Sequence, residues 1–169
     1  DMRMSREDQK TAVNVLNEYS AAELTRIFRE YGEERFAGKI ARRIVRERES
    51  QPITHADRLM DIIRRSVGSK FLVKSYARIF QALRIEVNRE LELLHDALAQ
   101  GLEILAGQGR LAVITYHSLE DRIVKQFIRS QEDPCICPPE LPECVCGRKP
   151  RMKRWKPVLI TPGPGEIAD

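Results

Sequence analysis

The sequence predicts an α/β protein that also carries a separate all-helical unit. Three observations support this fold class. Residues from about 5 to 70 show only short segments of helical periodicity, residues 75–105 carry one long apolar seam, and a β-branched run follows Gly107 and Gly109. A helix, a glycine turn, a strand, a loop and another helix in this order are typical of an α/β domain.

The first segment has clear helix signals. Ser20-Ala-Ala-Glu23 is a capping-box sequence, and apolar residues follow it at helical spacing as far as Gly32. A second helix is predicted from about Glu33 to Arg48, and a third is predicted to begin at Thr54-His-Ala-Asp57. The second helix carries a basic stripe, which either binds phosphates or is an ordinary solvated face: Arg35, Lys39, Arg42 and Arg46.

A longer helix is predicted next. From Ser75 to Leu105, apolar residues recur every three or four positions, which indicates one continuous helix that packs against a sheet. Arg84 and Asn88 are polar residues one turn apart on this helix. They either hold a neighbouring loop in place or contribute to a binding site.

The run Arg110-Leu-Ala-Val-Ile-Thr-Tyr116 predicts a buried strand of a parallel or mixed sheet. Ligands bind at the carboxyl edge of open α/β sheets, where the next helix offers unpaired N–H groups. Alternatively, Ser118 caps that helix, and Glu120 and Asp121 complement its dipole. Five residues capable of chemistry follow the strand directly: His117, Ser118, Glu120, Asp121 and Arg122.

Proline and cysteine dominate the segment that follows the next predicted helix. Residues 133–150 contain all four cysteines and five of the nine prolines. The cysteines form a C-x-C-x6-C-x-C pattern that suits a tetrahedral zinc or another soft metal, while two disulfides or free thiols are the alternatives: Cys135, Cys137, Cys144 and Cys146.

A basic segment, Gly147–Lys156, combines six positive charges with one indole ring. Clustered cations favour RNA phosphates, and the indole can stack on an exposed base. The alternative is a basic surface loop that Trp155 anchors to the core. The candidate RNA contacts are Lys149, Arg151, Lys153, Arg154, Trp155 and Lys156. A last short strand is predicted at residues 156–161.

Composition narrows the protein class. The 169 residues carry a net charge of +4 and are 42 % hydrophobic. No apolar run approaches the roughly 18 residues that a membrane-spanning helix needs, and the N-terminus lacks a signal-peptide core. We therefore expect a cytoplasmic protein. A chain that begins at Asp1 also suggests a missing upstream piece.

Four motifs in the same order and spacing resemble the bacterial RsmH (MraW) family of ribosomal RNA methyltransferases. They are Asp1-Met-Arg-Met4, Tyr31-Gly-Glu-Glu-Arg-Phe36, Phe80-Gln-Ala-Leu-Arg-Ile-Glu-Val-Asn88 and His117-Ser-Leu-Glu-Asp-Arg122. The resemblance implies transfer of a methyl group from S-adenosylmethionine to N4 of a cytidine in 16S ribosomal RNA of the small subunit. It also implies a Rossmann-like class I methyltransferase domain that is interrupted by a helical substrate domain.

The resemblance also implies which domain each segment of the chain belongs to. Residues 1–4 would end an upstream methyltransferase segment, residues 5–75 would form the inserted helical domain, and residues 76–169 would complete the catalytic domain, with a Cys/Pro-rich basic loop at 133–156. The family's cofactor-binding residues would lie upstream of Asp1. Two alternative functions for the chain are a non-catalytic RNA-binding module and a metal-binding scaffold.

Individual roles follow from the chemistry of the target. Cytosine N4 is a poor nucleophile, so methyl transfer needs acceptors for its protons. We expect His117, Glu120 and Asp121 to line the base pocket. Ser118 would shape the turn, and Arg122 would contact phosphate or pair with an acid.

Overall fold

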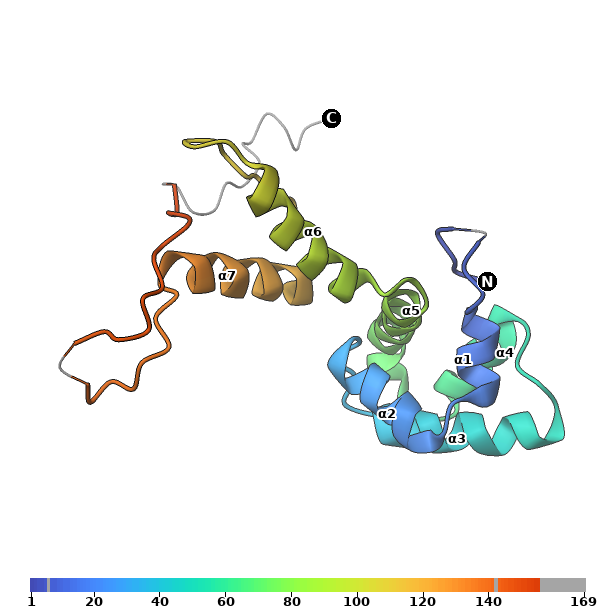
Figure 1. Ribbon diagram of the computed structural model, residues 1–169. Helices are drawn as coiled ribbons and strands as arrows, with labels where there is room; N and C mark the ends of the chain where they lie inside the picture. Colours follow the sequence, from blue (N-terminus) through green and yellow to red (C-terminus); the bar gives the residue numbers. More distant parts are fainter. Residues whose placement is uncertain (6, 142, 156–169) are drawn as a thin grey trace, which may run out of the picture. The chain divides into compact units, whose positions relative to one another are not determined.

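The computed structural model describes residues 1–5, 7–141 and 143–155. It divides into two compact units, Asp1–Leu93 and Leu94–Asp169 (Figure 1). Within the described residues all regular secondary structure is helical. No helix in that part of the chain is both long and apolar enough to cross a bilayer.

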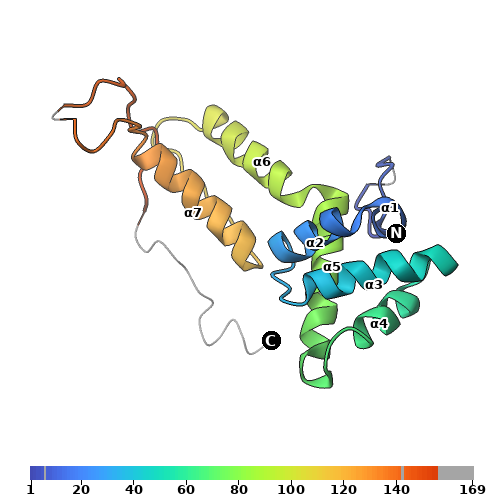
Figure 2. The ribbon, with the colours of Figure 1, turned by 90° about the horizontal axis from the view of Figure 1, so that it is seen from below.

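The first unit is built from five α-helices and one short 3₁₀ turn. They are α1 (Ala12–Glu18), α2 (Ala21–Glu30), α3 (Ala37–Ser50), α4 (Ala56–Arg64), the turn η1 (Ser69–Phe71) and α5 (Leu72–Asn88). Helix α5 packs against α1, α2 and α4, and α2 packs against α3 (Figure 2). The core between them is fully buried and includes Ile27, Phe28, Ile40, Ile44 and Leu83.

Local sequence signals explain where these helices begin. The predicted capping box is confirmed, because Glu23 N–H donates to Ser20 Oγ at 3.2 Å and Ser20 N–H donates to the Glu23 carboxylate at 2.8 Å. Helix α3 begins four residues later than expected, at Ala37. The intervening residues form a tight junction with α2.

That junction accounts for the contacts of the Tyr31–Phe36 motif. A Cβ atom on Gly32 would lie 2.6 Å from the carbonyl oxygen of Arg78, so the backbones approach too closely for a side chain. The buried Glu34 carboxylate accepts the N–H of Phe36 at 2.8 Å. The Arg35 guanidinium lies 3.8 Å from the ring centroid of Phe71. The motif therefore holds the junction between α2 and α3 against α5 and η1.

The prediction of one helix over residues 75–105 is wrong. Helix α5 ends at Asn88, and α6 (Glu90–Ile104) follows it. Arg89 between them has a left-handed backbone, with φ 51° and ψ 36°. The Asn88 side chain accepts the N–H of Met4 at 2.7 Å and donates to the carbonyl of Met2 at 3.0 Å. These contacts tie the N-terminal segment to the break, which the uninterrupted apolar periodicity conceals.

In the second unit, α6 packs against α7 (Ser118–Glu132). The small core between them contains Leu98, Leu102, Val124 and Phe127. The ring of His95 meets Phe127 edge-on, with the ring centroids 6.3 Å apart. This core is much smaller than that of the first unit.

The expected buried strand at 110–116 is not formed in the described structure, so the α/β, Rossmann-like part of the predicted fold is not confirmed. The segment contains no assigned strand. Its side chains alternate in exposure: Val113 packs on the α6–α7 core, whereas Ile114 is 82 % and Tyr116 90 % exposed. A strand exists only where a neighbouring strand receives its backbone hydrogen bonds, and no described segment does so. The predicted strand at 156–161 lies outside the described residues.

Candidate functional site

The five candidate catalytic residues lie together at the start of α7. His117 is the N-cap, and its Nδ1 accepts the N–H of Glu120 at 3.4 Å. Glu120 Oε2 in turn accepts the N–H of Tyr116 at 2.7 Å and that of His117 at 3.3 Å. His117 rather than Ser118 therefore caps the helix, in a capping box with an imidazole in place of the usual hydroxyl.

The cap also sets the protonation pattern of the imidazole. Because Nδ1 accepts a hydrogen bond, the neutral ring carries its proton on Nε2. Nε2 is buried, has no hydrogen-bond partner among the described residues, and lies 3.4 Å from Glu120 Oε1. Protonation of Nδ1 would break the cap, so the capped ring can donate a hydrogen bond from Nε2 but has no free lone pair with which to accept a proton.

Asp121 lies one residue further into the first turn of α7. Its Oδ2 pairs with Lys125 Nζ at 2.7 Å, one helical turn away. Both side chains are exposed, so the pair contributes little to stability. Ser118 and Arg122 occupy the same turn and also have interaction partners. The first turn of α7 thus presents an imidazole and two carboxylates within five residues.

Arg84 and Asn88 have contacts within the first unit. Arg84 binds Glu90 through two hydrogen bonds, Nε to Oε1 at 2.9 Å and Nη2 to Oε2 at 3.0 Å. Asn88 binds Met2 and Met4 as described above, and it also donates to the Arg84 carbonyl at 2.8 Å. These contacts agree with the alternative in which Arg84 and Asn88 hold a neighbouring loop in place.

The basic segment contacts the helices of the second unit. Arg151 pairs with Glu103 of α6 at 2.9 Å, and Arg154 pairs with Glu132 of α7 at 2.5 Å. The N–H of Arg154 and its guanidinium lower the pKa of Glu132.

The indole of this segment is stacked but still accessible. The Arg110 guanidinium lies 4.3 Å from the centroid of the Trp155 ring, yet Trp155 remains 69 % exposed. Lys149 and Lys153 are also exposed. Lys156 lies outside the described residues.

A second basic surface lies in the first unit and is larger than the sequence predicted. A groove of about 490 Å³ is lined by cations alone: Lys39, Arg42, Arg43, Arg46 and Arg65. Three of them belong to the predicted stripe of α3. Arg35 of that stripe is not among the lining residues and stacks on Phe71 instead. We call this surface the α3 groove.

Two arginines of the α3 groove were missed in the sequence. Arg43 donates a hydrogen bond to the carbonyl of Arg65, the C-cap of α4, which joins the two helices. Helical periodicity within α3 identifies the basic stripe of that helix, but it cannot identify Arg65, which comes from the C-cap of α4. Packing of α4 beside α3 supplies that cation.

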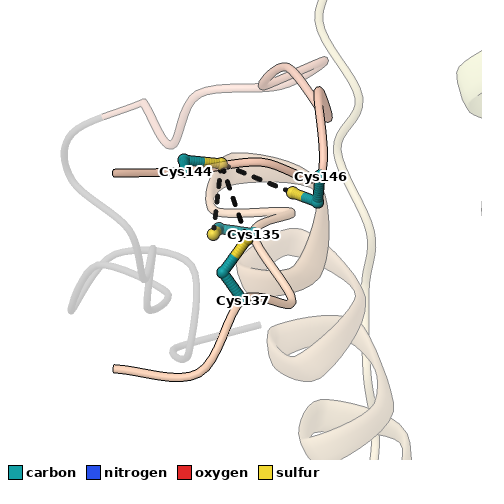
Figure 3. Close-up of side chains that lie close together, drawn as sticks. All are labelled: Cys135, Cys137, Cys144 and Cys146. Atoms are coloured by element: carbon teal, nitrogen blue, oxygen red, sulfur yellow. Dashed lines mark hydrogen bonds between the residues drawn. The ribbon is translucent and has the colours of Figure 1, made fainter. Parts of the chain in front are cut away.

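The four cysteines converge in the loop after α7 (Figure 3). All are free thiols, and each Sγ lies within 4.8 Å of the others. Cys144 Sγ is central, at 3.6 Å from Cys135 Sγ, 3.9 Å from Cys137 Sγ and 3.5 Å from Cys146 Sγ. The sequence pattern C-x-C-x6-C-x-C therefore produces one compact group of sulfurs.

The environments of two of these thiols differ. Hydrogen bonds from the N–H groups of Ile136 and Arg148 lower the pKa of Cys146 to about 6. The N–H of Cys137 lowers the pKa of Cys135, but contacts with the other thiols and burial outweigh it and raise that pKa to about 11. Of these two thiols, Cys146 therefore ionises more readily.

Comparison with known proteins gives one consistent relationship. A family model described as the MraW methylase family matches residues 1–169. The chain is 50 % identical over 169 residues to "Ribosomal RNA small subunit methyltransferase H" of Carboxydothermus hydrogenoformans. The aligned region covers 99 % of this chain and 54 % of that protein. The protein of the same name from Clostridium botulinum (strain Loch Maree / Type A3) is 50 % identical over 155 residues, 90 % of this chain and 50 % of its own length.

A third relative of the same name, from Lachnospira eligens, is 45 % identical over 170 residues, which is 99 % of this chain and 54 % of that protein. The chain therefore spans about half the length of the curated relatives it matches.

Proposed function

The chain belongs to the MraW methylase family, and on that basis we propose that the whole protein transfers a methyl group from S-adenosylmethionine to N4 of a cytidine in 16S ribosomal RNA. The carrying observation is the family match over residues 1–169, together with relatives of about half-identical sequence named as small-subunit ribosomal RNA methyltransferases. Its partner would be 16S ribosomal RNA or the small ribosomal subunit, in the cytoplasm. A free RNA-binding module or a metal scaffold as the main function is not favoured.

We assign the helical segment at 5–75 to substrate recognition, and residues 76–169 to part of a Rossmann-like catalytic domain. Val113 packs inward and Ile114 is open, which suits a strand whose sheet neighbours come from elsewhere in the protein. The described residues do not themselves fit the cofactor, because none of them forms a strand that leads through a glycine-rich turn into a helix.

The first turn of α7 is the proposed position for the cytosine base. The N4 lone pair is delocalised into the ring, so attack on a methyl donor requires that an N4 proton be drawn away. Asp121 offers an exposed carboxylate for this proton, and His117, whose Nδ1 is held by the cap, offers its Nε2–H as a hydrogen-bond donor to the base. Glu120 would orient His117 and the strand end, Ser118 would shape the turn, and Arg122 would contact phosphate.

Both basic surfaces support RNA as the substrate. The α3 groove is lined by five cations, one of which, Arg65, lies 4.0 Å from Glu47 Oε1, and the basic segment presents Lys149, Lys153 and an exposed indole. Phosphate neutralisation supplies affinity, and stacking on Trp155 would hold an unpaired base. Arg84 and Asn88 would fix the α5–α6 break, as in the alternative in which they hold a neighbouring loop.

The test is methyl transfer by the protein at its natural length, using labelled S-adenosylmethionine and small-subunit ribosomal RNA. We expect His117→Ala and Asp121→Ala each to lower kcat/KM at least about tenfold. His117→Asn is the matched control for the first variant, because asparagine restores a good N-cap but has no imidazole. Lys125→Ala is the control for the second, because it removes the same surface ion pair and keeps the carboxylate.

The outcomes separate catalysis from structure. If His117→Asn restores wild-type turnover, His117 is only a helix cap. If Lys125→Ala is as slow as Asp121→Ala, the ion pair rather than the carboxylate matters. Absence of labelled N4-methylcytidine with the wild-type protein would refute the proposed reaction itself.

A further inference from the structure

None of the described residues in the loop 133–150, which follows α7, belongs to a hydrophobic core. Helix α7 ends at Glu132, and the chain returns to it where the N–H of Arg151 donates to the Gln131 carbonyl at 3.0 Å. The described residues between these points form no helix or strand. Their large apolar side chains are exposed, at 64 % for Ile136 and 77 % for Val145. A long irregular loop of this kind needs a cross-link to hold one conformation.

The four sulfurs are arranged as a cross-linking metal would require. Zn–S bonds of about 2.3 Å in a tetrahedron place the sulfurs about 3.8 Å apart. The three distances from Cys144 Sγ are 3.5, 3.6 and 3.9 Å, and all four sulfurs lie within 4.8 Å of one another. Disulfides would instead join the sulfurs two by two. One sulfur at similar distances from the other three fits a single shared ion better.

We propose that Cys135, Cys137, Cys144 and Cys146 bind one zinc ion in a closed, structural tetrathiolate site that fixes the loop after α7. The proposal goes beyond methyl transfer, because four protein ligands leave no open position for substrate or water. Its function is to hold the basic segment, which begins directly after Cys146, at a fixed place beside α6 and α7.

The balance of charge at the site is also favourable. Zinc binds the four cysteines as thiolates, so the complete site carries a charge of −2, and every thiol that is still protonated releases its proton on binding. Arg148 and Lys149 lie two and three residues after the last ligand and supply compensating positive charge.

The first measurement is metal content. The whole protein, purified under reducing conditions without added metal or chelator, should contain about one zinc per chain by plasma mass spectrometry. After removal of zinc by a chelator, cobalt(II) should produce the thiolate charge-transfer bands and the visible bands of a tetrahedral tetrathiolate site. Zinc titration into the metal-free protein should release protons, which an indicator dye detects.

Two variants localise the site. Cys144→Ser removes the central sulfur and should weaken zinc binding at least about tenfold. Ile136→Ala is the matched control, because it changes an exposed side chain between two ligands and keeps the N–H that faces Cys146. The control should bind zinc as the wild type does.

Proteolysis tests the consequence for the loop without relying on a variant. Cleavage by trypsin after Arg148 should be several-fold slower with zinc than after chelation, and re-addition of zinc should restore protection. Less than half a zinc per chain, unchanged affinity in Cys144→Ser, or disulfides found by mass spectrometry after thiol blocking in intact cells would each overturn the proposal. None of these results depends on methyl-transfer activity.

Discussion

Removal of two cations from the α3 groove should reduce both the affinity for RNA and its salt dependence. Lys39 and Arg46 line the groove and are exposed, so Lys39→Gln/Arg46→Gln should leave the core of the first unit intact. Each phosphate contact contributes about 0.7 to 0.9 to the slope of log affinity against log salt. Loss of two contacts should therefore lower the slope by about 1.4 to 1.8.

The change is large enough to measure directly. Between about 50 and about 200 mM salt, the wild-type protein should lose about 7- to 12-fold more affinity than the double variant. Fluorescence anisotropy with a labelled fragment of small-subunit ribosomal RNA gives both slopes.

The matched control is Arg29→Gln/Lys74→Gln, which removes the same charge from exposed positions outside the groove. Equal slopes for the two double variants would show that only net charge matters and would refute the groove as the contact surface.

Three further predictions concern stability, measured by urea unfolding. Gly32→Ala should destabilise the protein by about 1–3 kcal/mol, because the new methyl group would meet the Arg78 carbonyl at 2.6 Å; no loss would mean that the α2–α3 junction can relax. Asn88→Ala should cost about 1–3 kcal/mol by leaving Met4 N–H without its partner, whereas an unchanged midpoint would show that water replaces it. The pKa of Tyr19 is raised, mainly by burial, and that of Lys10 is raised, mainly by its hydrogen bond to Tyr19. Because the folded protein holds these protons more tightly than the unfolded chain, the free energy of unfolding should fall as pH rises from about 9 to about 11. Tyr19→Phe should reduce that fall, and an identical pH profile would contradict the assignment.

The sequence predicted the helices of the first unit because their signals are local. The Ser20 capping box and the apolar spacing after it depend on residues within two turns, and both appear in the structure. The break at Arg89 could not be predicted in this way. It arises where Asn88 binds Met2 and Met4, more than eighty positions earlier in the chain.

The same distinction applies to the candidate sites. The spacing of the four cysteines was sufficient to predict that they meet, since all lie in one short loop. Arg65 of the α3 groove could not be found from the stripe on α3, because it is brought there by the packing of a different helix. The strand predicted at 110–116 would need neighbouring strands from distant parts of the sequence, and the periodicity of the segment does not show whether such strands are present.

His117 shows why a functional residue and a structural one can share a sequence signal. An N-cap needs an acceptor facing the second or third N–H of the helix, and Nδ1 of His117 meets this need. A base pocket needs a ring held in one tautomer, and the same hydrogen bond provides this too. The cap therefore does not argue against a place in the base pocket, since it leaves Nε2–H as a hydrogen-bond donor, but it does take the lone pair that a general base would need. Only a substitution that keeps the acceptor and removes the ring, such as His117→Asn, separates the two roles.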